Sequence, residues 1–96
     1  MPGVATREQL AQEHFVRFQA TQESEATKIR ELGRIFHAYV LEGEVRRLIA
    51  AGDYAALRTR DAGVYQSLKV IGPGGLKPLL AYIQAYVPMD DLVRVA

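Results

Sequence analysis

Proline is missing from most of this chain, and its distribution limits the fold more than any other feature. After Pro2, the next prolines are Pro73, Pro78 and Pro88. A proline inside a helix costs about 3 kcal/mol, so seventy residues without one, rich in Ala, Leu, Arg, Glu and Gln, favour helices. Aromatic and β-branched residues nowhere alternate with polar ones over a useful length, as they do in strands. The sequence therefore predicts an all-α protein, a small bundle of four to five helices that forms a single domain over residues 1–96.

Capping residues and apolar stripes set the expected limits of these helices. Thr6 is followed three residues later by Gln9, which is the pattern of a capping box at a helix start. Ser24 is the expected cap of the second helix, and Asp53 is the expected cap of a later one. The expected helices span approximately residues 6–21, 25–42, 44–51, 54–71 and 75–87, and a tail follows at 88–96.

Glycine positions add four expectations about the path of the chain, one of which is that Gly63 can divide the expected helix over 54–71 into two. Gly33 lies within an apolar stripe, which predicts a point where a second helix crosses closely. Gly52 is expected to end a helix. The segment 71–75 (Ile-Gly-Pro-Gly-Gly) is a loop by its composition, and Pro78 then falls in the first turn of the last helix, where a missing N–H costs little.

Composition excludes several classes of function. The chain has no cysteine, which removes disulfides, thiolate zinc sites, iron–sulfur clusters and cysteine nucleophiles. No apolar run approaches the ~20 residues that a membrane-spanning helix needs. The first four residues lack a charged-then-apolar leader, so we expect no secretory signal and a cytoplasmic protein without membrane contact.

Catalytic and metal-binding patterns are also missing. The two histidines, His14 and His37, have no carboxylate three or four residues away, as a helical metal site requires. The two serines, Ser24 and Ser67, lie in no nucleophile-elbow pattern. We therefore expect no enzymatic activity, no metal site and no cofactor.

Charge is distributed unevenly along the chain, although its net value is only +1. Residues 1–44 hold five basic and seven acidic side chains, whereas residues 45–80 hold six basic side chains against Asp53 and Asp61. Nine of the twelve basic residues are arginines, whose guanidinium groups bind phosphate oxygens in pairs. The basic segment is either a solvated face or a contact for a polyanion. The candidate nucleic-acid-binding residues are Arg30, Arg46, Arg47, Arg58, Arg60 and Lys69.

Aromatic residues suggest a second kind of contact. The apolar stripes of successive helices are wide, and Tyr39, Tyr82 and Tyr86 add aromatic surface to them. A domain this small has a thin margin of stability on its own. We therefore expect self-association or membership of a larger protein complex, with these three tyrosines at the interface.

Several segments resemble the small helical subunit of type III-A CRISPR effector complexes. Residues 27–32 (Thr-Lys-Ile-Arg-Glu-Leu) resemble a segment that opens a helix in that family. Residues 57–60 (Leu-Arg-Thr-Arg) and 64–67 (Val-Tyr-Gln-Ser) resemble its arginine-rich stretch, with residues 61–63 as an insertion, and residues 80–86 resemble its last helix. The resemblance covers about residues 27–87. It implies a non-catalytic, filament-forming subunit of an RNA-guided antiviral complex, with Arg30, Arg58 and Arg60 on the RNA backbone.

Two alternatives stay open. The chain could be a helical protein–protein interaction module, or a phage structural or adaptor protein, that binds no nucleic acid. Residues 71–74 (Ile-Gly-Pro-Gly) also resemble the turn of a helix-hairpin-helix motif, which would make the chain a DNA-binding protein using Gly72 and Gly74.

Overall fold

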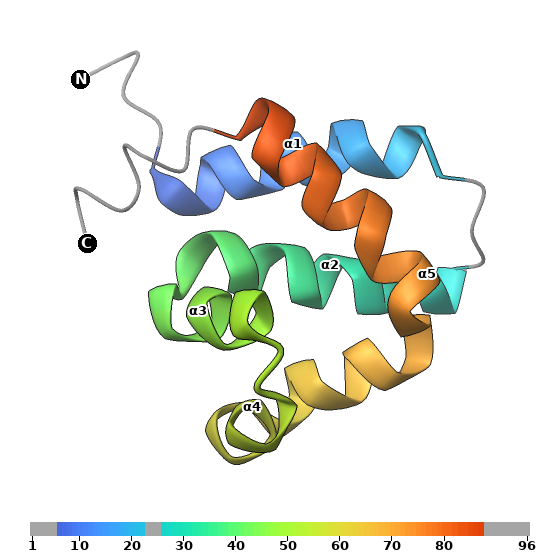
Figure 1. The fold of residues 1–96 in the computed structure, drawn as a ribbon. Coiled ribbons are helices and arrows are strands. Elements are labelled where there is room, and N and C mark those ends of the chain that lie inside the picture. The colour runs from blue at the N-terminus through green and yellow to red at the C-terminus, as the bar shows by residue number, and fades with distance from the viewer. Residues whose placement is uncertain (1–5, 23–25, 88–96) are drawn as a thin grey trace.

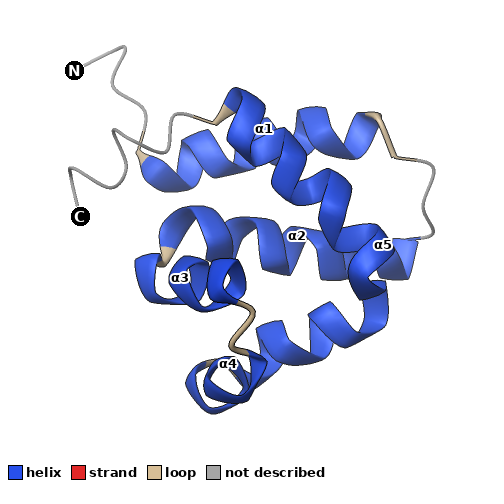
Figure 2. Ribbon diagram, viewed as in Figure 1, coloured by secondary structure: helices blue, strands red, loops and turns tan. Residues whose placement is uncertain are grey.

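A computed structural model describes residues 6–22 and 26–87, and this part of the chain is helical with short connections (Figures 1 and 2). Its helices are α1 (Arg7–Ala20), α2 (Ala26–Leu41), α3 (Gly43–Ala51), α4 (Tyr54–Arg60) and α5 (Ala62–Tyr86). The described residues contain no strand, so the predicted all-α class is confirmed. The expected cap at Ser24 and the expected tail at 88–96 lie outside the described residues.

The predicted helix caps are present. The Thr6 hydroxyl accepts a hydrogen bond from the Gln9 backbone N–H at 3.1 Å, and the Gln9 side chain accepts from the Thr6 N–H at 2.9 Å, which completes the capping box of α1. Gly52 ends α3 at a φ of +70°, a left-handed conformation that glycine adopts at little cost. Asp53 caps α4 by accepting from the Ala56 N–H at 3.2 Å.

The structure divides the expected helix over 54–71 at Asp61, two residues before Gly63, so the uninterrupted helix is wrong and the alternative of a division is present close to its expected place. Asp61 has a φ of −150° and a ψ of 89°, so α4 ends there and α5 begins after it. Its carboxylate accepts a hydrogen bond from the Val64 N–H at 3.1 Å, which satisfies one of the free donors in the first turn of α5.

The predicted loop over 71–75 is also wrong, since only Gly72 departs from helical geometry there. With a φ of +67° and a ψ of 177°, Gly72 bends α5 into two limbs, the amber and orange parts in Figure 1. Pro73 follows the bend at the start of the second limb, where its missing N–H and fixed φ suit a helix start. Pro78 lies further inside this limb than the first turn that the sequence predicts.

All the described helices contribute to the core, and α2 contacts α1, α3 and α5. Phe15 and Phe18 of α1 pack against Phe36 of α2 with ring centroids 5.4 Å and 5.9 Å apart. A Cβ atom on Gly33 would lie 3.1 Å from the Phe15 ring, which confirms the close helix crossing at this glycine. The residues with no exposed surface include Ala11, Ile35, Phe36, Val40, Val45, Leu57, Leu79 and Ile83.

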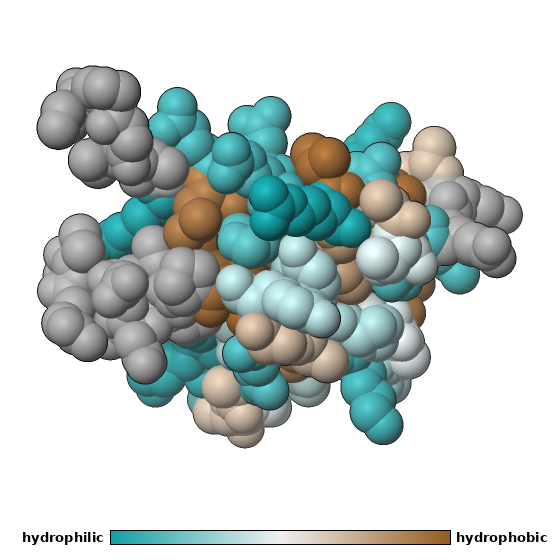
Figure 3. Space-filling model, turned by 90° about the horizontal axis from the view of Figure 1, so that it is seen from above, coloured by the Kyte–Doolittle hydropathy of each residue, from teal (hydrophilic) through white to brown (hydrophobic). Residues whose placement is uncertain are grey.

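The outer surface carries both hydrophilic and apolar side chains. Seen from above (Figure 3), hydrophilic side chains cover much of the surface, and apolar patches interrupt them. Val16, Val70 and Tyr86 are apolar side chains that stay more than half exposed. Within the described ranges, no helix is both long enough and apolar enough to cross a bilayer.

Candidate nucleic-acid interface and apolar groove

Arg46 and Arg47 are engaged within the fold. The Arg46 guanidinium donates to the backbone carbonyl of Tyr39 at 3.1 Å and approaches that of Val40 at 3.5 Å, so it satisfies carbonyl groups at the end of α2. Arg47 pairs with the Glu44 carboxylate one turn earlier on α3, with its Nε donating at 2.7 Å. Both guanidinium groups therefore already have partners within the fold.

Arg58 and Lys69 come together around one aromatic ring. The Arg58 guanidinium carbon lies 5.9 Å from the centroid of the Tyr65 ring, and the Lys69 Nζ lies 5.7 Å from it. Both distances lie within the range of cation–π attraction. The packing of α4 against α5 brings the three side chains together, and we call them the Tyr65 cluster.

No carboxylate of residues 6–22 or 26–87 forms an ion pair with this cluster. Among the described residues, ion pairs form at Arg34 and Arg47, and none involves Arg58, Arg60 or Lys69. Arg60 is exposed in the last turn of α4, together with Arg58. Positive charge at this place also complements the dipole of the helix.

Arg30 belongs to a different part of the surface. It lines a recess of about 590 Å³ between α2 and the first turn of α5, together with Arg34, His37 and Asp61. This recess shares no lining residue with the groove beside the Tyr65 cluster, which is described below. The structure thus does not join Arg30 to the other predicted residues through a common cavity.

The three predicted interface tyrosines differ in exposure. Tyr39 is only 7% exposed, because the apolar face of α2 turns it into the core, and it offers almost no surface to a partner. Tyr82 is half-buried, and its hydroxyl lies 3.2 Å from the His14 Nδ1. Tyr86 is 65% exposed, and its ring centroid lies 4.8 Å from that of Tyr82. Of the three, Tyr86 has the most accessible side chain.

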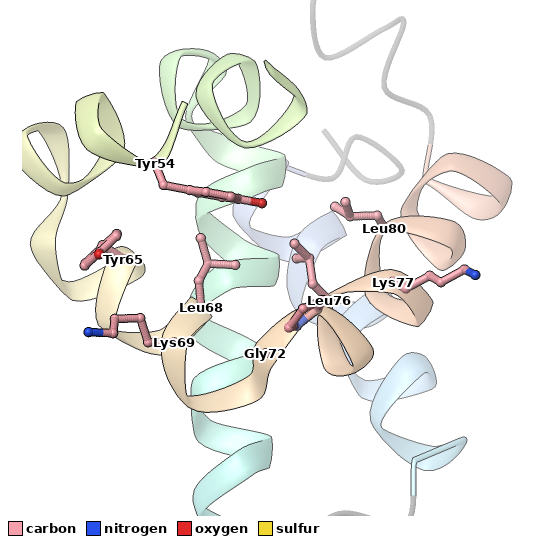
Figure 4. Close-up of a pocket in the computed structure, with 9 residues that line it drawn as sticks. Tyr54, Tyr65, Leu68, Lys69, Gly72, Leu76, Lys77 and Leu80 are labelled. Atoms are coloured by element: carbon pink, nitrogen blue, oxygen red, sulfur yellow. The ribbon is translucent and has the colours of Figure 1, made fainter. Parts of the chain in front are cut away.

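An apolar groove that the sequence analysis did not predict lies in the bend of α5 (Figure 4). It has a volume of about 560 Å³, and its lining contains no carboxylate. Leu68 from the first limb and Leu76 and Leu80 from the second limb point toward its centre, and the Tyr54 ring lies across from them. The lining residues of this apolar groove are Tyr54, Tyr65, Leu68, Lys69, Gly72, Pro73, Leu76, Lys77 and Leu80.

The histidines have local roles. The His37 Nδ1 donates to the Gly33 carbonyl at 2.8 Å, one turn earlier on α2. Burial lowers the pKa of His14 below its ordinary value of 6.5; the Arg17 guanidinium acts in the same direction and the Glu13 carboxylate opposes it. In residues 6–22 and 26–87, no three His, Asp or Glu side chains converge as a metal site needs.

The bend at Gly72 also bears on the helix-hairpin-helix alternative. The two limbs of α5 are joined by a single non-helical residue, not by the multi-residue turn suggested by the sequence. Gly74 is exposed, and a Cβ atom on it would meet nothing within 4 Å. Phosphate binding at this bend stays a prediction.

No family model, curated protein or solved structure matches this chain. Two groups of described side chains are candidates for binding. They offer cations beside an aromatic ring and an apolar groove with lysines at its edge, which are features that bind a ligand.

Proposed function

We propose that the protein is a non-catalytic helical assembly subunit that binds the RNA backbone through the Tyr65 cluster and Arg60. The observation that carries this proposal is the pair of cations held over one tyrosine ring without a described acidic partner. The resemblance to the small subunit of type III-A CRISPR complexes supports RNA as the polyanion, since Arg58 and Arg60 occupy matching basic positions.

The chemistry of the cluster suits contact with phosphate. A guanidinium group binds phosphate oxygens in pairs, whereas an ammonium group acts as a point charge. The Tyr65 ring limits the positions that Arg58 and Lys69 can take, which lowers the entropy lost when they bind. Such contacts fix the position of a strand without reading its sequence. In an RNA-guided complex, base pairing supplies the sequence reading.

The test is RNA binding by the double variant Arg58→Ala/Lys69→Ala. Fluorescence anisotropy with a labelled single-stranded RNA of about 20 nucleotides should be recorded between about 50 mM and 200 mM salt. We expect roughly tenfold weaker binding at low salt and a salt slope that is smaller by about one to two units. Circular dichroism should show unchanged helix content, since both side chains are exposed.

The matched control is Arg17→Ala/Lys28→Ala. It removes the same charge from exposed positions on α1 and α2, outside the proposed surface. If RNA binding depends only on net charge, the two double variants will weaken it equally, and the proposal fails. Unchanged affinity and salt slope in Arg58→Ala/Lys69→Ala would also remove the Tyr65 cluster from the site.

A further inference from the structure

The bend of α5 places leucine side chains in the middle of the apolar groove and one lysine on each side of them. Leu68, Leu76 and Leu80 form its floor and one wall, and the Tyr54 ring faces them from α4. Tyr54 is 43% exposed, so a ligand can reach the apolar centre without unfolding α4. The volume of about 560 Å³ falls within the ~300–1,000 Å³ that binding pockets have.

Two lysines mark opposite ends of the apolar groove. Lys69 belongs to the first limb of α5 and Lys77 to the second, and their side chains extend in opposite directions from the apolar centre (Figure 4). Both are exposed, and none of the described residues that line the groove is acidic. A complementary ligand therefore has an apolar middle and negative charge on both sides of it, toward Lys69 and toward Lys77.

We propose that the apolar groove binds an acidic amphipathic segment of a partner protein, with leucine-like side chains in the groove and carboxylates on Lys69 and Lys77. An amphipathic helix presents apolar residues along one stripe, with charged residues on either side of the stripe, and such helices bind in grooves of this kind. A fatty acid or similar amphiphile has one anionic head group and would leave one of the two lysines without a partner. The two lysines thus favour a peptide, which can carry a carboxylate for each of them, over an amphiphile with one anionic head group.

This inference does not depend on RNA binding, although Lys69 and Tyr65 belong both to the apolar groove and to the Tyr65 cluster. Lys77 belongs only to the groove, and Arg58 belongs only to the cluster. Lys77→Glu and Arg58→Ala therefore separate the two proposals. Loss of peptide binding in the first variant and loss of RNA binding in the second are independent results.

The experiment uses the full chain and a labelled synthetic peptide of about 16 residues, with leucines at helical spacing and glutamates along both sides of the leucine stripe. A control peptide has the same composition in scrambled order. Anisotropy should give a Kd of the order of 10–100 μM for the ordered peptide and much weaker binding for the scrambled one. Amide shifts in NMR spectra should change at Leu68, Leu76 and Leu80.

Lys77→Glu should weaken binding of the ordered peptide by about tenfold, because it places a negative charge where the ligand has one. Leu76→Ala should weaken binding several-fold without a change in charge. Lys28→Glu is the matched control, since it makes the same exposed charge reversal on α2 and should leave binding unchanged.

Three outcomes overturn the proposal. The first is no saturable binding of the ordered peptide up to about 1 mM, or equal binding of the scrambled peptide. The second is a Lys77→Glu variant that binds peptide normally but loses RNA, which would assign the groove to nucleic acid. The third is a protein that self-associates in sedimentation and becomes monomeric on Lys77→Glu, which would assign the groove to a second copy of this chain.

Discussion

Ser67 is a fully buried polar side chain, and its hydroxyl links α5 to α2. The hydroxyl donates to the Glu31 Oε1 at 2.5 Å and lies 3.1 Å from the Gly63 carbonyl. Arg34 lies near both groups, 3.5 Å from the hydroxyl and 3.8 Å from the carboxylate. Because the Glu31 side chain is only 16% exposed, little water can replace the hydroxyl as its partner.

Ser67→Ala should therefore lower the free energy of unfolding by about 1–2 kcal/mol, measured by urea denaturation. The double variant with Glu31→Ala should lose less than the sum of the single losses, with a coupling of at least about 0.5 kcal/mol. Strict additivity of the two losses would show that the short contact contributes nothing to stability.

His14 makes stability depend on pH. Its pKa is lowered in the folded protein, first by burial, so the unfolded chain binds more protons in the range below 6.5. Stability is thus fully present above the unfolded pKa and is lost as the pH falls through the folded pKa. Urea unfolding between about pH 8 and pH 5 should show this decrease, and His14→Gln should flatten it. An unchanged profile in His14→Gln would assign the decrease to another group.

At the scale of single residues, the sequence predicted correctly the features that depend only on residues close together in the chain. The Thr6–Gln9 capping box and the Asp53 cap depend on side chains three residues apart, and both are present. Tyr39 and Arg46 were predicted on the surface, and the structure engages both in the fold. The environment of Arg46 depends on where α2 ends and α3 begins, which no local pattern reports, whereas Tyr39 lies on the apolar face of α2 and its burial follows from that stripe.

The bend of α5 is the feature on which the apolar groove depends. Gly72 combines a positive φ with an extended ψ, a conformation that is essentially restricted to glycine. Any side chain there is strained, even though a Cβ atom would meet nothing within 4 Å. The strain comes from the backbone conformation and not from a steric clash.

Gly72→Ala should lower the free energy of unfolding by roughly 1–3 kcal/mol, measured by thermal or urea denaturation. Gly74→Ala is the matched control, because Gly74 lies in open space without a positive φ and should gain up to about 1 kcal/mol of helix propensity. Equal effects of the two substitutions would contradict the special role of Gly72.

The sequence placed an interruption between residues 71 and 75, and the bend lies within it, but a Gly-Pro-Gly-Gly run has the composition of a loop and does not show that a single residue makes the bend. Helical geometry resumes at Pro73, since packing of Leu79 and Ile83 in the core fixes the second limb. The break at Asp61 had a local signal, an aspartate placed to cap the turn that follows, although the sequence pointed to Gly63, two residues later, as the place of a division. The sequence did not indicate the groove, because the groove exists only where the two limbs of α5 meet at the bend.

At the scale of the whole molecule, helices of modest length enclose a small core. The Cα atoms have a radius of gyration of 13.1 Å and span 39 × 30 × 20 Å over the described residues. The two features proposed for binding, the Tyr65 cluster and the apolar groove, both lie along α4 and the bend of α5. A partner on this side would meet positive charge, in agreement with the basic segment 45–80 of the sequence.

Substitution of Tyr86 tests the predicted self-association at a surface separate from the apolar groove. Its side chain is 65% exposed near the end of α5, and a large aromatic surface of this kind contributes strongly when a partner covers it. Tyr86→Ser should weaken self-association by about tenfold in sedimentation equilibrium, equivalent to about 1.4 kcal/mol. The free energy of unfolding should change little, because the ring contributes mainly its contact with Tyr82.

Tyr54→Ser is the matched control, since Tyr54 is also exposed but lies on α4 beside the apolar groove. If the copies meet through the end of α5, only Tyr86→Ser will weaken their association. If Tyr54→Ser has the larger effect, the copies meet through the apolar groove. The assignment of Tyr86 to the interface is then wrong, and so is the proposal that the groove binds an acidic peptide. A monomer at all concentrations would remove Tyr86 from any interface between copies and leave a different protein or RNA as the partner to be sought.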